Sequence, residues 1–201
     1  MEDRKSHWET VYETKTPDQV SWTQKEPKIS LDFIRSFNLD KTAKILDVGG
    51  GDSNLVDFLL DEGFENISVL DISTRAIERA QKRLGKRANK VGWIVSDITE
   101  FEPLEEYDVW HDRAAFHFLT TKNQIEKYVA TTNQAVNGYL ILGTFSENGP
   151  KKCSGLDITQ YSETKMEATF TGFEKLRCFT DDHTTPFGTT QNFMYCSFKK
   201  K

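Results

Sequence analysis

The sequence predicts an α/β fold with a doubly wound, mostly parallel sheet and an antiparallel hairpin strand at the C-terminus. Short apolar runs alternate with amphipathic segments through most of the chain. A glycine-rich turn joins the first apolar run to the amphipathic segment that follows it. Two alternating segments, 173–179 and 192–198, come last and are typical of a hairpin.

Five segments carry apolar residues at helical spacing, and we expect them to be helices. The first has Ile29, Phe33 and Phe37 on one face, and Gly63 and Gly85 close the second and third. The fourth starts at a capping box of Thr121 and Gln124 and should end at Gly138. The expected helices begin near residues 29, 54, 74, 121 and 163.

Five apolar runs between these segments are expected to be parallel strands. The run 139–145 is apolar almost throughout, as a strand in the middle of a sheet should be. The other runs each end in or near an acidic or histidine residue. The expected strands cover 44–47, 67–71, 93–97, 107–111 and 139–145.

The glycine turn after the first strand predicts a nucleoside site. Asp47 ends the strand, and Gly49 to Gly51 follow, so that a ligand could lie against bare backbone and helix N-terminal amides. The second strand ends in Asp71, which is suited to bind two ribose hydroxyls. Asp71 could instead be a simple helix cap, because a helix begins just after it.

The turn does not fit a dinucleotide. The dinucleotide fingerprint needs a third glycine where this chain has Asn54. Asp47 and Asp52 flank the turn and would repel a pyrophosphate, but they would suit a ligand that carries positive charge. A dehydrogenase is therefore disfavoured.

The segment Asp47-Val-Gly-Gly-Gly51 resembles the Asp/Glu-x-Gly-x-Gly motif of class I S-adenosylmethionine-dependent methyltransferases. The resemblance runs from about Ile29 to the C-terminus, with the motifs in the right order. It implies seven strands, the last antiparallel, and S-adenosylmethionine as cofactor. It also implies cofactor contacts from each strand end: Asp47, Gly49 and Gly51 at the methionine, Asp71 and Ile72 at the ribose and adenine, Asp97 and Ile98 at the adenine edge, and His111 near the methyl group.

Residues 1–27 are expected to form an aromatic N-terminal cap, and residues 28–201 the cofactor-binding domain, in a single-domain chain. Large aromatic side chains in the first segment need burial. Trp22 is a candidate lid over the cofactor, although it could also be a core residue that pins the cap.

Methyl transfer from a sulfonium needs alignment and sometimes a base, but no metal. His111, Asp112, His117 and His183 are the candidates for catalysis, because a histidine can titrate near neutral pH. A structural alternative is an ion pair between Asp112 and Arg113, with His117 only packed or capping.

The acceptor is expected to be a small molecule, with a thiol or another soft nucleophile as one option. An aromatic pocket of Trp8, Trp22, Phe116, Phe145 and Phe187 would suit it. The segment after the fourth strand lacks the Asn/Asp-Pro-Pro-Tyr pattern of methyltransferases that act on nucleic-acid amino groups. A protein lysine methyltransferase, with Asp181 and Asp182 near the methyl, is the alternative, and a non-catalytic cofactor-binding module is another.

Composition sets further expectations. A net charge of −5 argues against a nucleic-acid partner, and no segment has the run of apolar residues that a membrane span needs. The start of the chain lacks an apolar signal region. Three cysteines, Cys153, Cys178 and Cys196, indicate reduced thiols and a cytoplasmic protein. The sequence does not set the oligomeric state.

Overall fold

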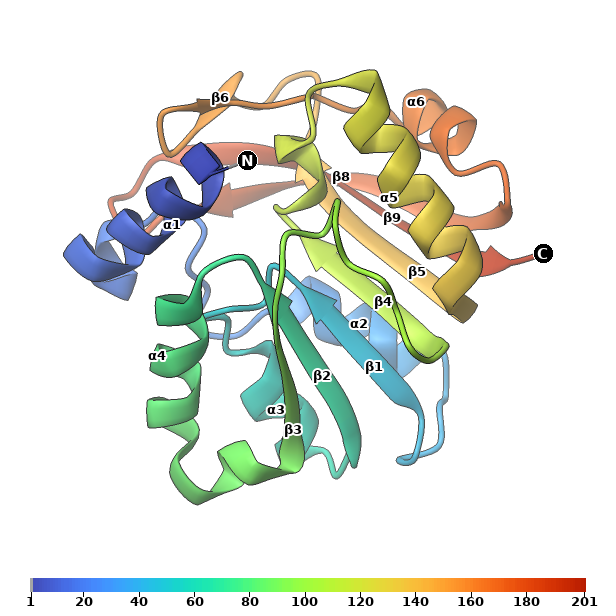
Figure 1. Cartoon of the computed structure of the whole chain (residues 1–201). Helices are drawn as coiled ribbons and strands as arrows, with labels where there is room; N and C mark the ends of the chain where they lie inside the picture. The colour runs from blue at the N-terminus through green and yellow to red at the C-terminus, as the bar shows by residue number, and fades with distance from the viewer. Residues whose placement is uncertain (1) are drawn as a thin grey trace.

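A computed structural model describes residues 2–201, with side chains from Arg4 onward, and its core is one seven-stranded sheet (Figure 1). The strand order is β3-β2-β1-β4-β5-β9-β8. Strands β1 to β5 are parallel, and β9 runs antiparallel to both β5 and β8. The predicted fold is confirmed. The strands are β1 Lys44–Val48, β2 Asn66–Asp71, β3 Val91–Val95, β4 Tyr107–Arg113, β5 Val136–Phe145, β8 Phe173–Thr184 and β9 Thr190–Lys200.

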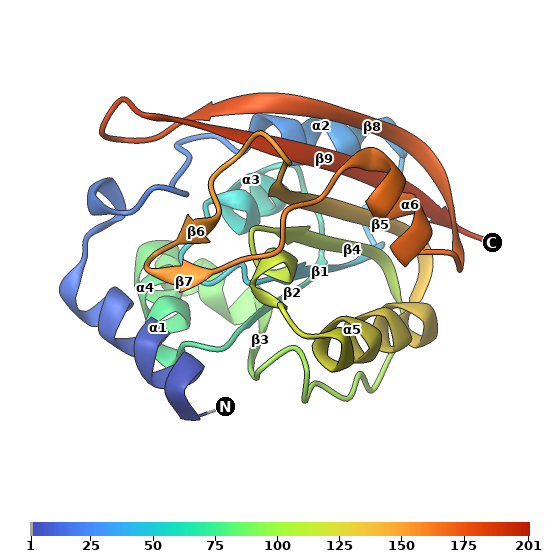
Figure 2. The ribbon, with the colours of Figure 1, turned by 90° about the horizontal axis from the view of Figure 1, so that it is seen from above.

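Helices cover both faces of the sheet (Figure 2). Neighbouring residues of β1 belong to different core clusters, since side chains alternate along a strand. Ile45 packs with α2 and α3, whereas Leu46 packs with α5 and α6. The helices are α2 Lys28–Ser36, α3 Leu55–Asp61, α4 Thr74–Leu84, α5 Lys122–Ala135 and α6 Glu163–Thr169. Short 3₁₀ turns cover Pro17–Gln19, Gly85–Lys90 and Phe116–Phe118, and β6 Lys152–Cys153 pairs with β7 Leu156–Asp157.

A further helix, α1 Glu2–Thr14, opens the chain and packs beside α4 (Figure 1). Its Glu9 carboxylate accepts hydrogen bonds from the backbone N–H groups of Thr74, at 2.8 Å, and Arg75, at 3.1 Å. The hydroxyl of Ser73, which is the N-cap of α4, donates to the same carboxylate at 3.0 Å. Glu9 therefore satisfies donors at the start of α4, which is what an acidic side chain at a helix N-terminus does best.

Local expectations were confirmed except at the end of α5 and at β3, which covers Val91–Val95 instead of the expected 93–97. The capping box of Thr121 and Gln124 is formed, and Gly63 follows α3 with a φ of +86°. Gly138 does not end α5, because α5 stops at Ala135 and Gly138 lies inside β5. A Cβ there would meet the carbonyl oxygen of Asp108, so this glycine allows β4 and β5 to approach closely near an irregularity in their pairing.

The hairpin is longer than the sequence pattern predicted. Polar residues continue both strands past the alternating segments, and pairs such as Asp182 with Asn192 extend the ladder. The turn is confined to the residues between Thr184 and Thr190. The extended end of the hairpin runs past the sheet toward the N-terminal segment (Figure 2).

Cysteine pairing was predicted wrongly. Cys178 and Cys196 face each other in the β8–β9 register and form a disulfide, and Cys153 is free and buried. Cross-strand register brings the two together, and register cannot be read from cysteine spacing alone. The cysteines therefore do not support a cytoplasmic location. Within residues 2–201, no helix is long and apolar enough to cross a membrane.

Candidate active site

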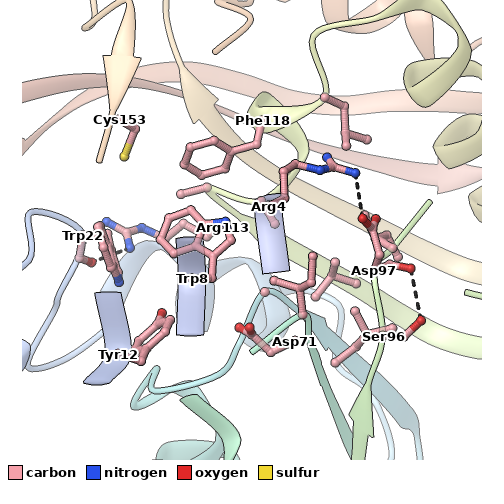
Figure 3. A pocket seen from close by; sticks show the side chains of 18 residues that line it. Arg4, Trp8, Tyr12, Trp22, Asp71, Ser96, Asp97, Arg113, Phe118 and Cys153 are labelled. Carbon is pink, nitrogen blue, oxygen red and sulfur yellow. Dashed lines mark hydrogen bonds and ion pairs between the residues drawn. The ribbon is translucent and has the colours of Figure 1, made fainter. Parts of the chain in front are cut away.

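Two adjoining cavities lie at the carboxyl ends of the central strands, where ligands bind in open α/β sheets. The larger, here the main cavity, is lined by residues that follow β2 and β3, by the end of β4 and by α1 (Figure 3). The smaller, here the second cavity, lies against the glycine turn and α2. Tyr12, Trp22, Gly49 and Arg113 line both cavities, so a ligand with two ends could span them.

The glycine turn fits closely between two carboxylates. Gly49 adopts a φ of +67°, which favours glycine. A Cβ on Gly50 would meet the Asp47 carboxylate, and one on Gly51 would lie 2.5 Å from Oδ2 of Asp71. The turn therefore needs glycine at these positions to place its backbone between Asp47 and Asp71.

Asp47 is only 2 % exposed, and only one of its two carboxylate oxygens has a hydrogen-bond partner. Its Oδ1 lies 2.7 Å from Nδ1 of His111, whose Nε2 lies 2.8 Å from the hydroxyl of Ser30. Its Oδ2 is buried and has no hydrogen-bond partner. An unpartnered carboxylate oxygen beside the second cavity is costly unless a ligand donates to it, and an ammonium group would do so best.

Asp71 lies at the floor of the main cavity (Figure 3). Its Oδ1 accepts a hydrogen bond from the Ser73 N–H at 2.8 Å. Burial raises the pKa of Asp71 to about 7, although hydrogen bonds from the Ser73 and Gly51 N–H groups oppose the rise. Ile72 and Ile98 line the same cavity and give it apolar walls.

Asp97 stands at the edge of the main cavity and is held by two elements. Its Oδ1 accepts from the N–H and the hydroxyl of Thr99, at 2.9 and 2.8 Å. Its Oδ2 accepts from Nη2 of Arg4 at 2.7 Å, which ties α1 to the loop after β3 (Figure 3). The N-terminal helix thus covers the main cavity.

Aromatic side chains close the cavity from the α1 side. The Trp8 ring makes edge contacts with Trp22, at 5.5 Å between centroids, and with Phe118, at 5.1 Å. Tyr12 lies below them and also contacts Trp22 (Figure 3). Trp22 therefore lies where a lid is expected, with the aromatic residues of α1 around it.

Among the described residues, three of the four catalytic candidates line neither cavity. Asp112 is buried and accepts from the N–H groups of Ala115 and Phe116, each at 3.0 Å, and from the Tyr128 hydroxyl at 2.7 Å. Burial raises its pKa to about 6. These contacts fix the turn after β4, and the carboxylate lies outside the described linings of both cavities.

The two other candidates are histidines that hold the backbone. His117 is fully buried, and its Nδ1 accepts from the Phe145 N–H at 3.2 Å. Burial lowers the pKa of His117 to about 3, with the charge of Arg113 adding to the effect. His183 donates from Nε2 to the Ser21 carbonyl at 2.7 Å. Only His111 lies at a cavity wall, and both of its ring nitrogens are engaged.

Several contributors were not found from the sequence. The alternative ion pair between Asp112 and Arg113 is wrong, because neighbouring strand residues point to opposite faces. Arg113 instead donates to the Trp22 carbonyl (Figure 3) and to the Tyr195 hydroxyl. Side chains alternate between the two faces of a strand, and this alternation could have shown from the sequence that Asp112 and Arg113 point apart. Arg4, Glu9 and Phe118 gave no sequence signal, because their places depend on tertiary packing.

The expected aromatic pocket is only partly formed. Trp8 and Trp22 line the main cavity. Phe116 and Phe145 are core residues, and Phe187 is 55 % exposed in the turn of the β8–β9 hairpin. Aromatic content alone does not distinguish a cavity wall from a core.

The residues fit S-adenosylmethionine. Its amino acid end could place an ammonium on the unpartnered Asp47 oxygen, and its ribose could donate to Asp71. The glycine turn lies between these two carboxylates and has no room for side chains. Apolar Ile72 and Ile98, with Asp97 beyond them, suit an adenine ring.

Comparisons with known proteins agree with this fit. Residues 45–137 match the family described as a methyltransferase domain. The malonyl-[acyl-carrier protein] O-methyltransferase of Anoxybacillus flavithermus is 33 % identical over 105 residues, which is 51 % of this chain and 39 % of that protein. The chain therefore spans about two fifths of the length of the curated relatives it matches.

Solved structures share the fold across nearly the whole chain. The N-methyltransferase NodS from Bradyrhizobium japonicum, in complex with S-adenosyl-L-homocysteine, has a TM-score of 0.74 and 17 % identity and covers 96 % of this chain and 97 % of that one. The 1,6-didemethyltoxoflavin-N1-methyltransferase of Burkholderia thailandensis has a TM-score of 0.72 and 13 % identity, over 98 % and 87 %. Over residues 45–137 the chain is therefore similar to a methyltransferase domain, and it shares its fold with these solved methyltransferase structures.

Proposed function

We propose that this protein transfers a methyl group from S-adenosylmethionine to a small-molecule acceptor. The observation that carries the proposal is the pair of carboxylates on either side of the glycine turn. Asp47 has a buried oxygen with no partner, and Asp71 faces the adjoining main cavity. Such a pair, joined by a glycine backbone, matches the two polar ends of this cofactor and no phosphate.

Each described residue of the site would have a distinct task. Asp47 would hold the ammonium group, with His111 and Ser30 fixing the orientation of its carboxylate. Asp71 would bind the ribose hydroxyls, while Asp97, Ile72 and Ile98 would bind the adenine. Trp22 would exclude water together with the aromatic residues of α1, which strengthens electrostatic interactions inside the site.

When bound, the cofactor supplies a methyl group already activated on a sulfonium. The protein then has to align the acceptor with that methyl and keep water away, and alignment alone can supply much of the rate. His111 cannot readily act as a base, because both of its nitrogens are engaged. His117, Asp112 and His183 would act on the fold, by holding backbone groups in place.

A small acceptor is favoured because α1 covers the main cavity and Arg4 closes its edge. A protein lysine acceptor is less favoured, since Asp181 and Asp182 lie on β8 and are absent from the described linings of both cavities. A thiol acceptor stays a prediction, as does a cytoplasmic location. The curated relatives are named as malonyl-[acyl-carrier protein] O-methyltransferases, so their acceptor is attached to a carrier protein.

Two measurements test the proposed function. Titration calorimetry with S-adenosylhomocysteine should show binding to the wild type, at least about tenfold weaker binding to Asp47→Asn, and no change in Asp32→Asn. Asp32 is the matched control, because it is an exposed aspartate on α2. Label transfer from methyl-labelled cofactor into small molecules of a cell extract tests catalysis. Cofactor binding without any transfer would favour a non-catalytic module, and label on protein would favour the lysine alternative.

A further inference from the structure

Arg113 is a charged residue at the junction of the two cavities that the described protein groups leave without a counter-charge. Its Nε donates to the Tyr195 hydroxyl at 3.2 Å, and its Nη1 donates to the Trp22 carbonyl at 2.8 Å. The guanidinium carbon lies 5.0 Å from the centre of the Phe193 ring. All of these partners are neutral.

The remaining nitrogen of Arg113 lacks even a neutral partner. Nη2 is buried and makes no hydrogen bond to any described residue. A buried donor without a partner costs free energy, and more so when it belongs to a charged group. A retained charge of this kind at a cavity wall indicates that a ligand supplies the missing anion.

The other charges of the main cavity are already assigned. Arg4 pairs with Asp97 at 2.7 Å. Asp71 accepts hydrogen bonds from backbone and faces the expected ribose. Of the positively charged residues in the described lining, Arg113 is therefore the one without a charged protein partner.

Apart from Asp71, which faces the expected ribose, the described lining of the main cavity offers no group suited to take a proton from the acceptor. Burial raises the pKa of Cys153 to about 11 and the pKa of Tyr12 well above its usual value, so both side chains keep their own protons. Asp97 already accepts three hydrogen bonds. An acceptor that arrives as an anion needs no base, whereas an ammonium or an alcohol does.

Resting on the proposed function, we propose that Arg113 recognises the acceptor and that the acceptor is a small carboxylic acid, bound and methylated as its carboxylate. A carboxylate is the anion that a guanidinium binds with the best geometry. In the transfer, a carboxylate oxygen forms a bond to the methyl carbon and the bond from methyl to sulfur breaks. The electron pair of that bond stays on sulfur, and no proton moves. The methyl ester is neutral and loses its ion pair with Arg113, which favours its release.

The first test uses the chemistry of the product. Wild-type protein is incubated with methyl-labelled S-adenosylmethionine and a small-molecule extract, and the products are treated with alkali. Methyl esters release labelled methanol under alkali, whereas methyl amines and thioethers do not. We expect alkali-labile label that falls at least about tenfold in Arg113→Met. Alkali-stable label, or no label from protein that binds the cofactor, overturns the inference.

A matched variant separates the site from general effects of losing an arginine. Arg177→Met removes a guanidinium that lies 4.5 Å from the Phe179 ring on β8, outside both cavities, and should leave transfer unchanged. Arg113→Lys keeps the positive charge but loses the planar pair of N–H donors, and it should transfer more methyl than Arg113→Met but less than the wild type. Equal activity in Arg113→Met and wild type overturns the assignment.

Calorimetry distinguishes the acceptor's carboxylate from the cofactor's own. S-adenosylhomocysteine has a carboxylate, and methylthioadenosine lacks the amino acid end. We expect Arg113→Met to bind both within about twofold of wild type. Selective loss of S-adenosylhomocysteine affinity would assign Arg113 to the cofactor and overturn the inference. If wild type binds neither ligand, the proposed function itself fails.

Discussion

Arg4 and Asp97, ninety-three positions apart, form an ion pair of 2.7 Å across the edge of the main cavity. Asp97 is the residue expected at the adenine, and Arg4 belongs to the helix that covers the cavity. The same helix is anchored at Glu9 to the start of α4. Two polar contacts, one to the loop after β3 and one to the start of α4, therefore hold α1 over the cavity.

Removing the Arg4 contact should speed cofactor release. In Arg4→Met, the Glu9 contact remains, so α1 should stay folded but open more often. A partly buried ion pair of this kind is worth about 1 kcal/mol, or about a fivefold change in rate. Stopped-flow dissociation of S-adenosylhomocysteine measures it, with Lys5→Met as the control because Lys5 is an exposed neighbour on the same helix. An unchanged rate in Arg4→Met would mean that α1 does not limit release.

Cofactor affinity should rise with pH through the titration of Asp71. Burial raises its pKa to about 7, so below that pH the carboxyl is protonated and accepts ribose hydroxyls less well. Between pH 6 and 8, S-adenosylhomocysteine should bind up to about tenfold more tightly to the wild type. Asp71→Asn should bind more weakly, by about tenfold or more at pH 8, and show a flat profile. A profile in Asp71→Asn as steep as that of wild type would assign the titration to another group.

His117 should make the protein sensitive to acid. Its pKa is about 3 in the folded protein, because burial disfavours the charged form, and about 6.5 in the unfolded chain. The unfolded chain thus binds more protons between these values. The stabilisation is fully present above pH 6.5 and is lost as the pH falls, by about 1.4 kcal/mol per pH unit.

The variant His117→Gln tests this sign. Its amide oxygen can still accept from the Phe145 N–H but does not titrate. Urea unfolding at pH 7, 6 and 5 should show a smaller loss of stability on acidification in the variant than in the wild type. Parallel curves would show that folding does not lower the pKa of His117.

The disulfide between Cys178 and Cys196 should stabilise the hairpin at the edge of the sheet. It closes a segment with a sequence separation of 18 residues. Loop closure of this size is worth about 2–4 kcal/mol. A reductant should lower the free energy of unfolding of the wild type by this amount and have little effect on Cys178→Ser. If the reductant destabilised Cys178→Ser as much as the wild type, the effect would not come from this disulfide. Cys153→Ser, which keeps the disulfide, should respond to the reductant like the wild type.

The sequence was most informative where chemistry follows the path of the backbone. Asp47, Asp71 and Asp97 end or follow parallel strands, and such ends gather at one edge of a sheet whatever the packing elsewhere. The glycine turn, which follows the first parallel strand, predicted a site at the same edge of the sheet. For these residues, the predicted arrangement in space agrees with the structure, and their roles stay predictions.

Contacts between distant segments could not be found in this way. Arg4 reaches Asp97 only because α1 lies across the cavity, and the polar, aromatic sequence of that segment did not reveal a helix. The pairing of Cys178 with Cys196 depends on strand register, and the burial of His117 depends on how the turn after β4 packs under β5. Each needs the assembled sheet before it can be seen.

The contact of Trp8 with Trp22 gives the protein an optical reporter of its own. Both indoles line the main cavity, one from α1 and one from the segment before α2. An adenine ring or a moving helix would change their surroundings, whereas Trp110 is shielded in the core by Tyr128. Fluorescence emission can therefore follow ligand entry in real time without any dye, and a Trp22→Phe variant would show which indole carries the signal.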